Sequence, residues 1–286
     1  MKKPALFLKF NGQLLDLNNP LVMGIVNVTP DSFFAKSRFK SGRSLIYQVE
    51  KFVKEGVSII DVGGYSTRPN AEKVSIDEEM DRVGDALTSI RKHFPDLLVS
   101  VDTFRSGVAR MAAEEFGVGM INDISGGNLD PSMFETIASI DVAYVLMHSR
   151  GTPQNMQNLT DYNHPVAEIL HLLSKKVAQL HLLGVNDVII DPGFGFAKTL
   201  EQNYKLLASL SYFKQAGVPL MVGVSRKSMI YKLLDCTPDE ALNGTTAVHM
   251  LALMGGASIL RVHDVAEAVE TIKIFNCYCE NLKNTK

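Results

Sequence analysis

Two patterns of apolar and polar positions follow one another along this chain. In residues 5–18 (ALFLKFNGQLLDLN), apolar and polar side chains alternate on either side of Asn11-Gly12. Because Asn-Gly tolerates the positive φ angles of a tight two-residue turn, this stretch predicts a β-hairpin. From residue 21 onward, short runs that are apolar at nearly every position take turns with longer segments of helical spacing.

The short apolar runs are typical of strands buried on both faces, as in a parallel sheet. They are residues 21–29, 57–64, 97–103, 120–123, 143–148, 188–193, 219–225 and 258–263. The segments between them predict helices. In the clearest one, an apolar stripe runs from Ile76 through Val83 to Phe94, and Ser75 followed by Glu78 is the start of a capping box. The last helix repeats this spacing from Val265 to Leu282.

Eight strand–helix units without a visible linker predict an α/β fold, a (β/α)8 TIM barrel with an N-terminal β-hairpin. We expect a single domain over residues 1–286, with the hairpin in 1–20 and the barrel in 21–282. A doubly wound open sheet is the rival. It usually has a glycine-rich turn after its first strand, whereas Thr29-Pro30-Asp31 stands there and no GxGxxG occurs in the chain.

Composition narrows the class of protein only a little. The net charge is −2, without the basic excess of a general nucleic-acid binder, so no nucleic-acid partner is expected. No apolar run approaches the ~20 residues of a membrane-spanning helix, and the N-terminus does not have the pattern of a signal peptide. Three cysteines without a CxxC pair predict buried reduced thiols and a cytoplasmic location.

Polar side chains stand at the end of almost every predicted strand. In a barrel these ends meet on one face, which is where active sites of this fold lie. A single Asp, Asn or Ser at such a place is often only a loop cap, but eight ends converging on one face favour a site. The residues are Asn27, Asp61, Asp102, Asn122 with Asp123, His148, Asp191, Ser225, and Arg261 with His263.

The kinds of residue indicate the ligand. Asp102, Asn122 and Asp191 offer acceptors to a flat heterocycle edge that carries several N–H donors, and Lys227 suits a ring carbonyl. A second group is suited to an anion with a divalent metal, beside Asn27: Thr67, Arg68, Arg261 and His263. Ser225 is expected to begin a helix whose free N–H groups hold a carboxylate or phosphate. Lys198 is expected to be a solvated helix start.

From Leu21 to about Ile274 the sequence resembles the dihydropteroate synthase family of pterin-binding enzymes. Each matching stretch is short, but their order and spacing make the joint match specific. The stretches are GIVNVTPDSF, DVGGYSTRPNA, SVDT, INDISGG, LMHSRGTPQNMQ, DPGFGFAKT, GVSRK and NGTTAVHMLALMGGASILRVHDV.

The resemblance implies a reaction in which 6-hydroxymethyl-7,8-dihydropterin pyrophosphate and p-aminobenzoate give 7,8-dihydropteroate and pyrophosphate. It implies a pterin pocket formed by Asp102, Asn122, Met147, Asp191, Phe196 and Lys227. The pyrophosphate site would comprise Asn27, Asp61, Thr67, Arg68, Arg261 and His263, with Mg²⁺ at Asn27. The p-aminobenzoate site would comprise Phe33, Pro69 and Ser225. The resemblance also suggests a homodimer through outer helices.

Two positions depart from the family's usual pattern. Ala35 stands where the first loop usually has an aspartate, which removes a metal contact, and Asp31 is the candidate to replace it. Tyr65 stands where the second loop usually has a glutamate. Neither change touches a strand-end residue, so we expect activity to persist.

Two alternatives share the pterin pocket. A pterin-binding corrinoid methyltransferase has no need for the Ser-Thr-Arg-Pro loop or for the anion set of Arg261 and His263. A catalytically silent pterin-binding paralogue is supported only by the two altered loops.

Overall fold

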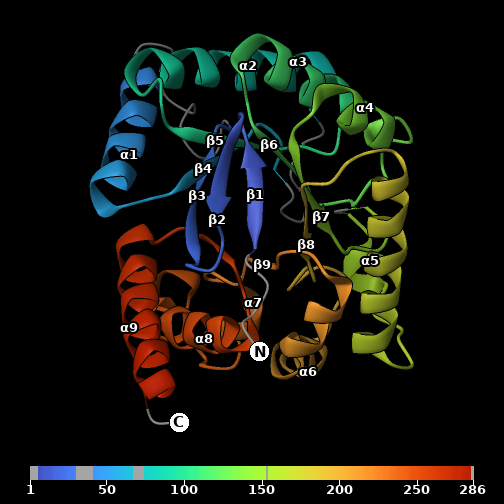
Figure 1. Ribbon diagram of the computed structural model, residues 1–286, viewed down its shortest axis with the longest axis vertical. Coiled ribbons are helices and arrows are strands. Elements are labelled where there is room, and N and C mark those ends of the chain that lie inside the picture. Colours follow the sequence, from blue (N-terminus) through green and yellow to red (C-terminus); the bar gives the residue numbers. More distant parts are fainter. Residues whose placement is uncertain (1–5, 30–40, 67–73, 153, 285–286) are drawn as a thin grey trace.

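Eight parallel strands curl into a nearly closed barrel, with helices around its outside (Figure 1). The computed structural model describes residues 6–29, 41–66, 74–152 and 154–284. The strands are β3 (Leu21–Asn27), β4 (Ile59–Gly63), β5 (Leu98–Asp102), β6 (Met120–Asp123), β7 (Ala143–Met147), β8 (Val188–Asp191), β9 (Met221–Val222) and β10 (Ile259–Val262). Neighbours follow the order β8-β7-β6-β5-β4-β3-β10-β9, and a bridge from Ile190 to Leu220 joins the two ends. The predicted barrel is confirmed.

The helices alternate with these strands as the sequence predicts. They are α1 (Ser41–Glu55), α2 (Ile76–His93), α3 (Ser106–Phe116), α4 (Met133–Ile140), α5 (Pro165–Leu182), α6 (Leu200–Ala208), α7 (Ser228–Tyr231), α8 (Leu242–Gly255) and α9 (Val265–Asn284). Short 3-10 turns lie at Met156–Asn158, Leu210–Ala216 and Pro238–Glu240.

The N-terminus of α2 shows how a local sequence signal becomes structure. Ser75 Oγ accepts the Glu78 backbone N–H at 3.1 Å, which is the expected cap. The Glu78 carboxylate pairs with Arg82 one turn later. Val83 is buried as the stripe predicts, but Ile76 at the first position of the helix is exposed.

The N-terminal hairpin covers the amino end of the barrel. Its strands are β1 (Phe7–Phe10) and β2 (Gln13–Asp16), and φ is positive at Asn11 and Gly12, so the predicted turn is confirmed. Phe10 belongs to a cluster with residues at the starts of the barrel strands. Asn11 Nδ2 donates to Gly117 O at 2.8 Å, just before β6. With this end covered, the opposite, carboxyl end of the strands is left for a site.

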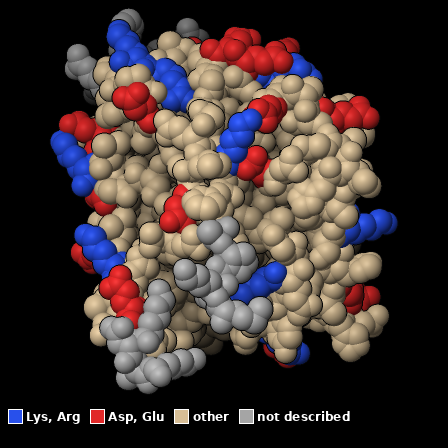
Figure 2. Space-filling model, viewed as in Figure 1, with Lys and Arg blue, Asp and Glu red and all other residues tan. Residues whose placement is uncertain are grey.

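Surface features agree with part of the sequence analysis. On the face drawn in Figure 2, basic and acidic side chains are interspersed rather than gathered by sign. None of the helices in the described part of the chain is both long and apolar enough to cross a bilayer. The three cysteines are free, but Cys277 is exposed, so the expectation that all are buried is wrong. The reason is that Cys277 lies on the outward face of α9.

Candidate active site at the carboxyl ends of the strands

An arginine bridge joins the ends of three strands. Arg261 on β10 donates from Nε to Asp61 Oδ2 and from a terminal nitrogen to Asp102 Oδ2, each at 2.6 Å. Asn122 Nδ2 donates to the same Asp61 Oδ2 at 2.8 Å. These contacts connect residues up to 200 positions apart in sequence. We call Asp61, Asp102, Asn122 and Arg261 the arginine-bridged cluster.

Strand register explains why Asp102 and Asn122 of this cluster lie level with Asn27. Asn27 on β3 is paired with Gly63, Gly63 with Asp102, and Asp102 with Asn122, so neighbouring strands bring them to one level. Gly63 contributes no side chain between its neighbours, and a Cβ there would lie 3.5 Å from both Asn27 Oδ1 and Asp102 Cβ. The sequence expectation that these ends converge is therefore met in the structure.

The arginine-bridged cluster contains two hydrogen-bond acceptors that receive no hydrogen bond from the described residues. Asp61 Oδ1 and Asn122 Oδ1 are buried, and neither has a hydrogen-bond partner within the described residues. A buried acceptor without a partner is costly, so such atoms point to a ligand or water. Burial raises the pKa of Asp102 to about 7, against the opposing effect of Arg261. Burial disfavours the charged form of Arg261, but Asp61 and Asp102 hold its pKa above the ordinary value.

Asp191 and Lys227 form the other side of the site. The side chains of both lie near Gly223, where a Cβ would be 3.9 Å from Asp191 Oδ2 and 3.8 Å from Lys227 Nζ. Asp191 Oδ1 accepts the Gly193 N–H at 2.7 Å, and the nearby Lys227 charge opposes the rise that burial causes in the pKa of Asp191. Burial lowers the pKa of Lys227 to about 8, although Asp191 partly offsets this. The Lys227 ammonium donates to Phe194 O at 2.6 Å and lies 4.7 Å from the Phe196 ring centroid.

Met147 and Phe196 are placed as neighbours of these polar groups. Met147 at the end of β7 is buried and paired in register with Asp191. Phe196 is half-buried in the turn after β8. Both are therefore available to pack against a flat ring beside Asp191, as the sequence analysis expects.

Lys198 and His148 form a buried layer behind Asp191. Lys198 is only 4% exposed, so the expectation of a solvated helix start is wrong. Its ammonium donates to Gly193 O at 2.8 Å and Phe196 O at 2.9 Å, and lies 3.1 Å from His148 Nδ1. Burial lowers the pKa of Lys198 to about 7, and burial with the Lys198 charge lowers that of His148 to about 2. His148 is therefore a neutral acceptor, and the pair fixes the turn that carries Phe196.

Asp123, the second polar residue at the end of β6, is occupied within the protein. Its carboxylate accepts from the Tyr144 hydroxyl at 2.6 Å and from the backbone N–H groups of Ser125 and Gly127, each at 2.7 Å. Asp123 therefore shapes the turn after β6 instead of facing a ligand.

The segment after β9 differs from the sequence expectation. Helix α7 begins at Ser228, three residues after Ser225, because Arg226 adopts a left-handed conformation with φ of 52°. The Arg226 guanidinium pairs with Asp264 and donates to two backbone carbonyls, so it is not free for an anion. Ser225 is buried, and its Oγ accepts the His263 N–H at 3.2 Å and lies 3.1 Å from His263 Nδ1. The prediction that Ser225 starts a helix is wrong.

Several expected site residues lie outside the described residues. They are Asp31, Phe33, Ala35, Thr67, Arg68 and Pro69. The described residues at the two ends of segment 67–73 contact Arg105, a residue that the sequence analysis missed. Its position two residues after the SVDT stretch is the only signal that could have indicated it.

The residues present were compared with the needs of Mg²⁺. Within the described residues, no three or more His, Cys, Asp or Glu side chains are grouped to hold a metal ion. Asn27 Oδ1 is an oxygen of the kind that Mg²⁺ binds, and a Cβ at Gly63 would lie 3.5 Å from both this atom and Asp102 Cβ. Mg²⁺ usually takes one or two protein oxygens and completes its octahedron with substrate phosphates and waters. The described residues therefore fit an ion that is held mainly by a bound pyrophosphate.

The barrel and its site define a class of protein: an enzyme that takes a flat, donor-rich heterocycle next to an anion. The family model described as pterin binding enzyme matches residues 23–263, and this chain belongs to that family. Relatives within it are dihydropteroate synthases. The Synechocystis sp. enzyme is 45% identical over 256 residues, covering 88% of each chain. The Escherichia coli K12 enzyme is 41% identical, covering 92% of this chain and 93% of its own.

Solved structures of dihydropteroate synthases have the same fold as this chain. The Yersinia pestis dihydropteroate synthase, crystallised with a sulfonamide drug, is 37% identical, with a TM-score of 0.88 over 96% of this chain and all of its own. The Xanthomonas albilineans dihydropteroate synthase, solved with 4-aminobenzoic acid, is 35% identical, with a TM-score of 0.87 over 96% of this chain and 98% of its own.

Proposed function

We propose that this protein is a dihydropteroate synthase, a transferase of folate biosynthesis. It joins 6-hydroxymethyl-7,8-dihydropterin pyrophosphate to p-aminobenzoate and releases pyrophosphate. The observation that carries the proposal is the set of buried acceptors beside Arg261, Asp61 Oδ1 and Asn122 Oδ1, which have no hydrogen-bond partner among the described residues. Relatives of similar length and barrel support the same activity.

The pterin ring would lie between the arginine-bridged cluster and Asp191. Asp102, Asn122 and Asp191 would accept its ring N–H and amino donors, and Lys227 would donate to its carbonyl. Met147 and Phe196 would pack on its faces. This assignment is supported by buried acceptors on one side and, on the other, by the Asp191 and Lys227 side chains that both lie near Gly223.

The pyrophosphate would face Arg261, His263 and Asn27, together with Thr67 and Arg68. Arg261 is suited to this role because two carboxylates keep it charged and fix its direction. Asp61 is fully buried beneath it, so its part in the pyrophosphate site would be to hold Arg261 and Asn122 in place. Mg²⁺ bound at Asn27, with Asp31 as the second candidate ligand, would neutralise part of the pyrophosphate charge.

The chemistry is a displacement at a methylene on an electron-rich ring, so an SN1-like path is reasonable. The ring stabilises positive charge as pyrophosphate departs. The enzyme then has to stabilise the departing anion and position a neutral amine, and no strong nucleophile has to be activated. Asp61 and Asp102 close to the ring add negative potential that favours the cation.

The p-aminobenzoate site would involve Phe33, Pro69 and Ser225. Ser225 Oγ is shared with His263, so its contribution to the carboxylate would couple the two substrate sites. Because the Yersinia pestis relative was solved with a sulfonamide drug, we further propose that sulfonamides compete with p-aminobenzoate here. A cytoplasmic homodimer is part of this proposal.

Pyrophosphate release tests the function. The protein, Mg²⁺ and dihydropterin pyrophosphate are mixed with and without p-aminobenzoate, and pyrophosphate and dihydropteroate are measured. We expect dihydropteroate only with p-aminobenzoate, matched by an equal amount of pyrophosphate. The absence of any release would favour the silent paralogue. Methyl transfer to a corrinoid protein, without pyrophosphate release, would favour the methyltransferase.

A further inference from the structure

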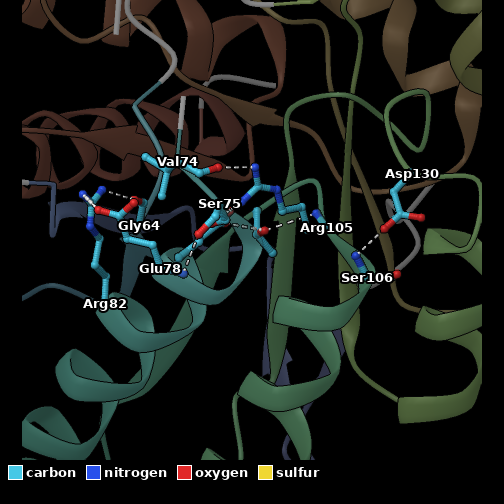
Figure 3. A network of polar contacts seen from close by, with 10 residues as sticks. Gly64, Val74, Ser75, Glu78, Arg82, Arg105, Ser106 and Asp130 are labelled. Carbon is cyan, nitrogen blue, oxygen red and sulfur yellow. Dashed lines mark hydrogen bonds and ion pairs between the residues drawn. The ribbon is translucent and has the colours of Figure 1, made fainter. Parts of the chain in front are cut away.

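Arg105 contacts both described ends of segment 67–73. Residues Gly64–Ser66 lead into this segment after β4, and Val74 and Ser75 lead out of it into α2. The Arg105 guanidinium donates to Val74 O at 2.6 Å and to Ser75 O at 2.8 Å. On the other side it lies 5.3 Å from the centroid of the Tyr65 ring. Figure 3 shows Arg105 reaching from the start of α3 toward Val74 and Ser75.

A buried carboxylate holds Arg105 in this position. Glu79 on α2 is fully buried, and its Oε2 lies 2.8 Å from the Arg105 guanidinium. The other oxygen, Oε1, accepts the Thr103 hydroxyl at 2.7 Å. Glu79 also packs against the backbone of the β4 end, since a Cβ at Gly64 would lie 3.1 Å from Glu79 Cγ. Arg105 therefore has a fixed direction before it meets the ends of the segment.

The same short stretch of chain carries the pterin site. Asp102 of the arginine-bridged cluster is three residues before Arg105, and the Thr103 N–H donates to Asn122 O at 3.0 Å. Phe104 lies between Thr103 and Arg105 in the sequence, and its ring packs edge-to-face on Tyr65 with ring centroids 5.1 Å apart. Tyr65 thus presents an aromatic face to Arg105. A shift of Arg105 would move the segment ends relative to Asp102.

We propose that Arg105 is a positioning residue for the reaction: it fixes the two ends of segment 67–73 relative to the arginine-bridged cluster. The inference rests on the proposed function, since the sequence assigns Thr67 and Arg68 of that segment to the pyrophosphate. The alternative is an ion pair that only fastens α2 to α3. The two differ because a purely structural pair would affect stability and pterin binding together with turnover.

The kinetic test compares Arg105→Met and Arg105→Lys with the matched control Arg110→Met. Arg110 lies on α3, the helix that Arg105 precedes. It is exposed and contacts Glu114 and Ser139 instead of the segment ends. For Arg105→Met we expect kcat/KM for dihydropterin pyrophosphate to fall about tenfold to a hundredfold. The calorimetric Kd for a pterin without pyrophosphate should stay unchanged. Arg105→Lys keeps the charge beside Glu79 but loses the two-carbonyl fork, so it should rescue part of kcat, and Arg110→Met should match the wild type.

Three results would overturn the inference. Wild-type kinetics in Arg105→Met would show that the contacts do not matter for turnover. An equal loss of pterin affinity and turnover would show a general structural effect. No rescue by lysine, with stability retained, would exclude a role for the charge. A wild-type protein without pyrophosphate release would instead refute the proposed function.

A second measurement does not depend on activity. Trypsin cleavage after Lys73 is followed by mass spectrometry of the native protein. Arg105→Met and Arg110→Met each lack one arginine, so these two variants have the same number of tryptic sites. We expect cleavage there to accelerate several-fold in Arg105→Met and not in Arg110→Met, because Val74 loses its hydrogen bond. Faster cleavage would support the anchoring even if the proposed reaction failed. Unchanged cleavage would overturn it.

Discussion

Asp191 has one carboxylate oxygen that accepts the Gly193 N–H, and its other oxygen lies near Gly223, as Lys227 does. We expect Asp191→Ala to weaken pterin binding by about 2–4 kcal/mol, because ring donors would be left without a charged acceptor. Calorimetric titration with a pterin measures this. The exposed Asp161→Ala is the control and should bind normally. Near-normal affinity in Asp191→Ala would contradict its place in the pterin pocket.

Arg261 is expected to act mainly as charge develops on the leaving group. In Arg261→Ala, kcat should fall together with kcat/KM, because a contact that strengthens in the transition state is lost. One such charge-assisted contact is worth about 2–4 kcal/mol, or roughly thirty- to a thousand-fold in rate. Steady-state kinetics with both substrates measure the effect. The kcat of Arg261→Lys should lie between those of the wild type and Arg261→Ala.

Removing Arg261 also leaves Asp61 and Asp102 without their cation, so urea unfolding of each variant serves as the control. The variant should be compared under conditions in which it is fully folded. If only the KM for p-aminobenzoate changed, the placement of the anion site would be wrong.

For single residues, the sequence predicts the position of a side chain when that position follows from the barrel topology. Asp102, Asn122 and Asp191 follow apolar strands, and any parallel barrel brings such ends together. Lys198 could not be placed, because its burial depends on carbonyls of the preceding turn and on His148, 50 positions away. Arg226 likewise depends on Asp264, 38 positions away. A local sequence does not encode these partners.

Substitutions on the two faces of the N-terminal hairpin are expected to lower stability by different amounts. Phe10 is fully buried in the cluster at the amino end of the barrel, whereas Phe7 on the same strand is 53% exposed. Phe10→Ala should lower the free energy of unfolding by about 3–5 kcal/mol, since it removes a buried ring and leaves a cavity. Phe7→Ala should cost much less, and urea denaturation compares the two. Equal losses would mean that the hairpin does not cover the barrel as described.

Elements with clear local signals were predicted well, whereas the segment of β9 and α7 was not. Residues 76–94 and the Asn-Gly hairpin have local signals that agree with their packing. By contrast, β9 has only two residues and α7 only four, although the sequence around them reads as a long strand followed by a helix from Ser225. The left-handed turn at Arg226 separates them, and that turn is stabilised by contacts with α8 and with the end of β10.

At the scale of the whole molecule, the outer surface matters, and helix α8 has apolar side chains on more than one side. Val248, Ala252 and Leu253 pack inward, yet Leu251 and Met254 are 51% and 56% exposed. A helix in an outer ring usually presents polar residues to water. Leu251 and Met254 are three residues apart and share a face, so this face of α8 is suited to a second copy of the chain.

A homodimer through α8 makes a prediction about mass. Light scattering after gel filtration should give twice the chain mass of 31.5 kDa for the wild type. Met254→Asp places a charge in the apolar patch, and burying an unpaired charge is costly, so this variant should elute as a monomer. Leu182→Asp is the control, because Leu182 on α5 is 89% exposed and outside this face. A monomeric wild type, or a Met254→Asp variant that stays dimeric, would exclude this interface. A monomeric Met254→Asp variant with the kcat of the wild type would show that each barrel holds a complete site.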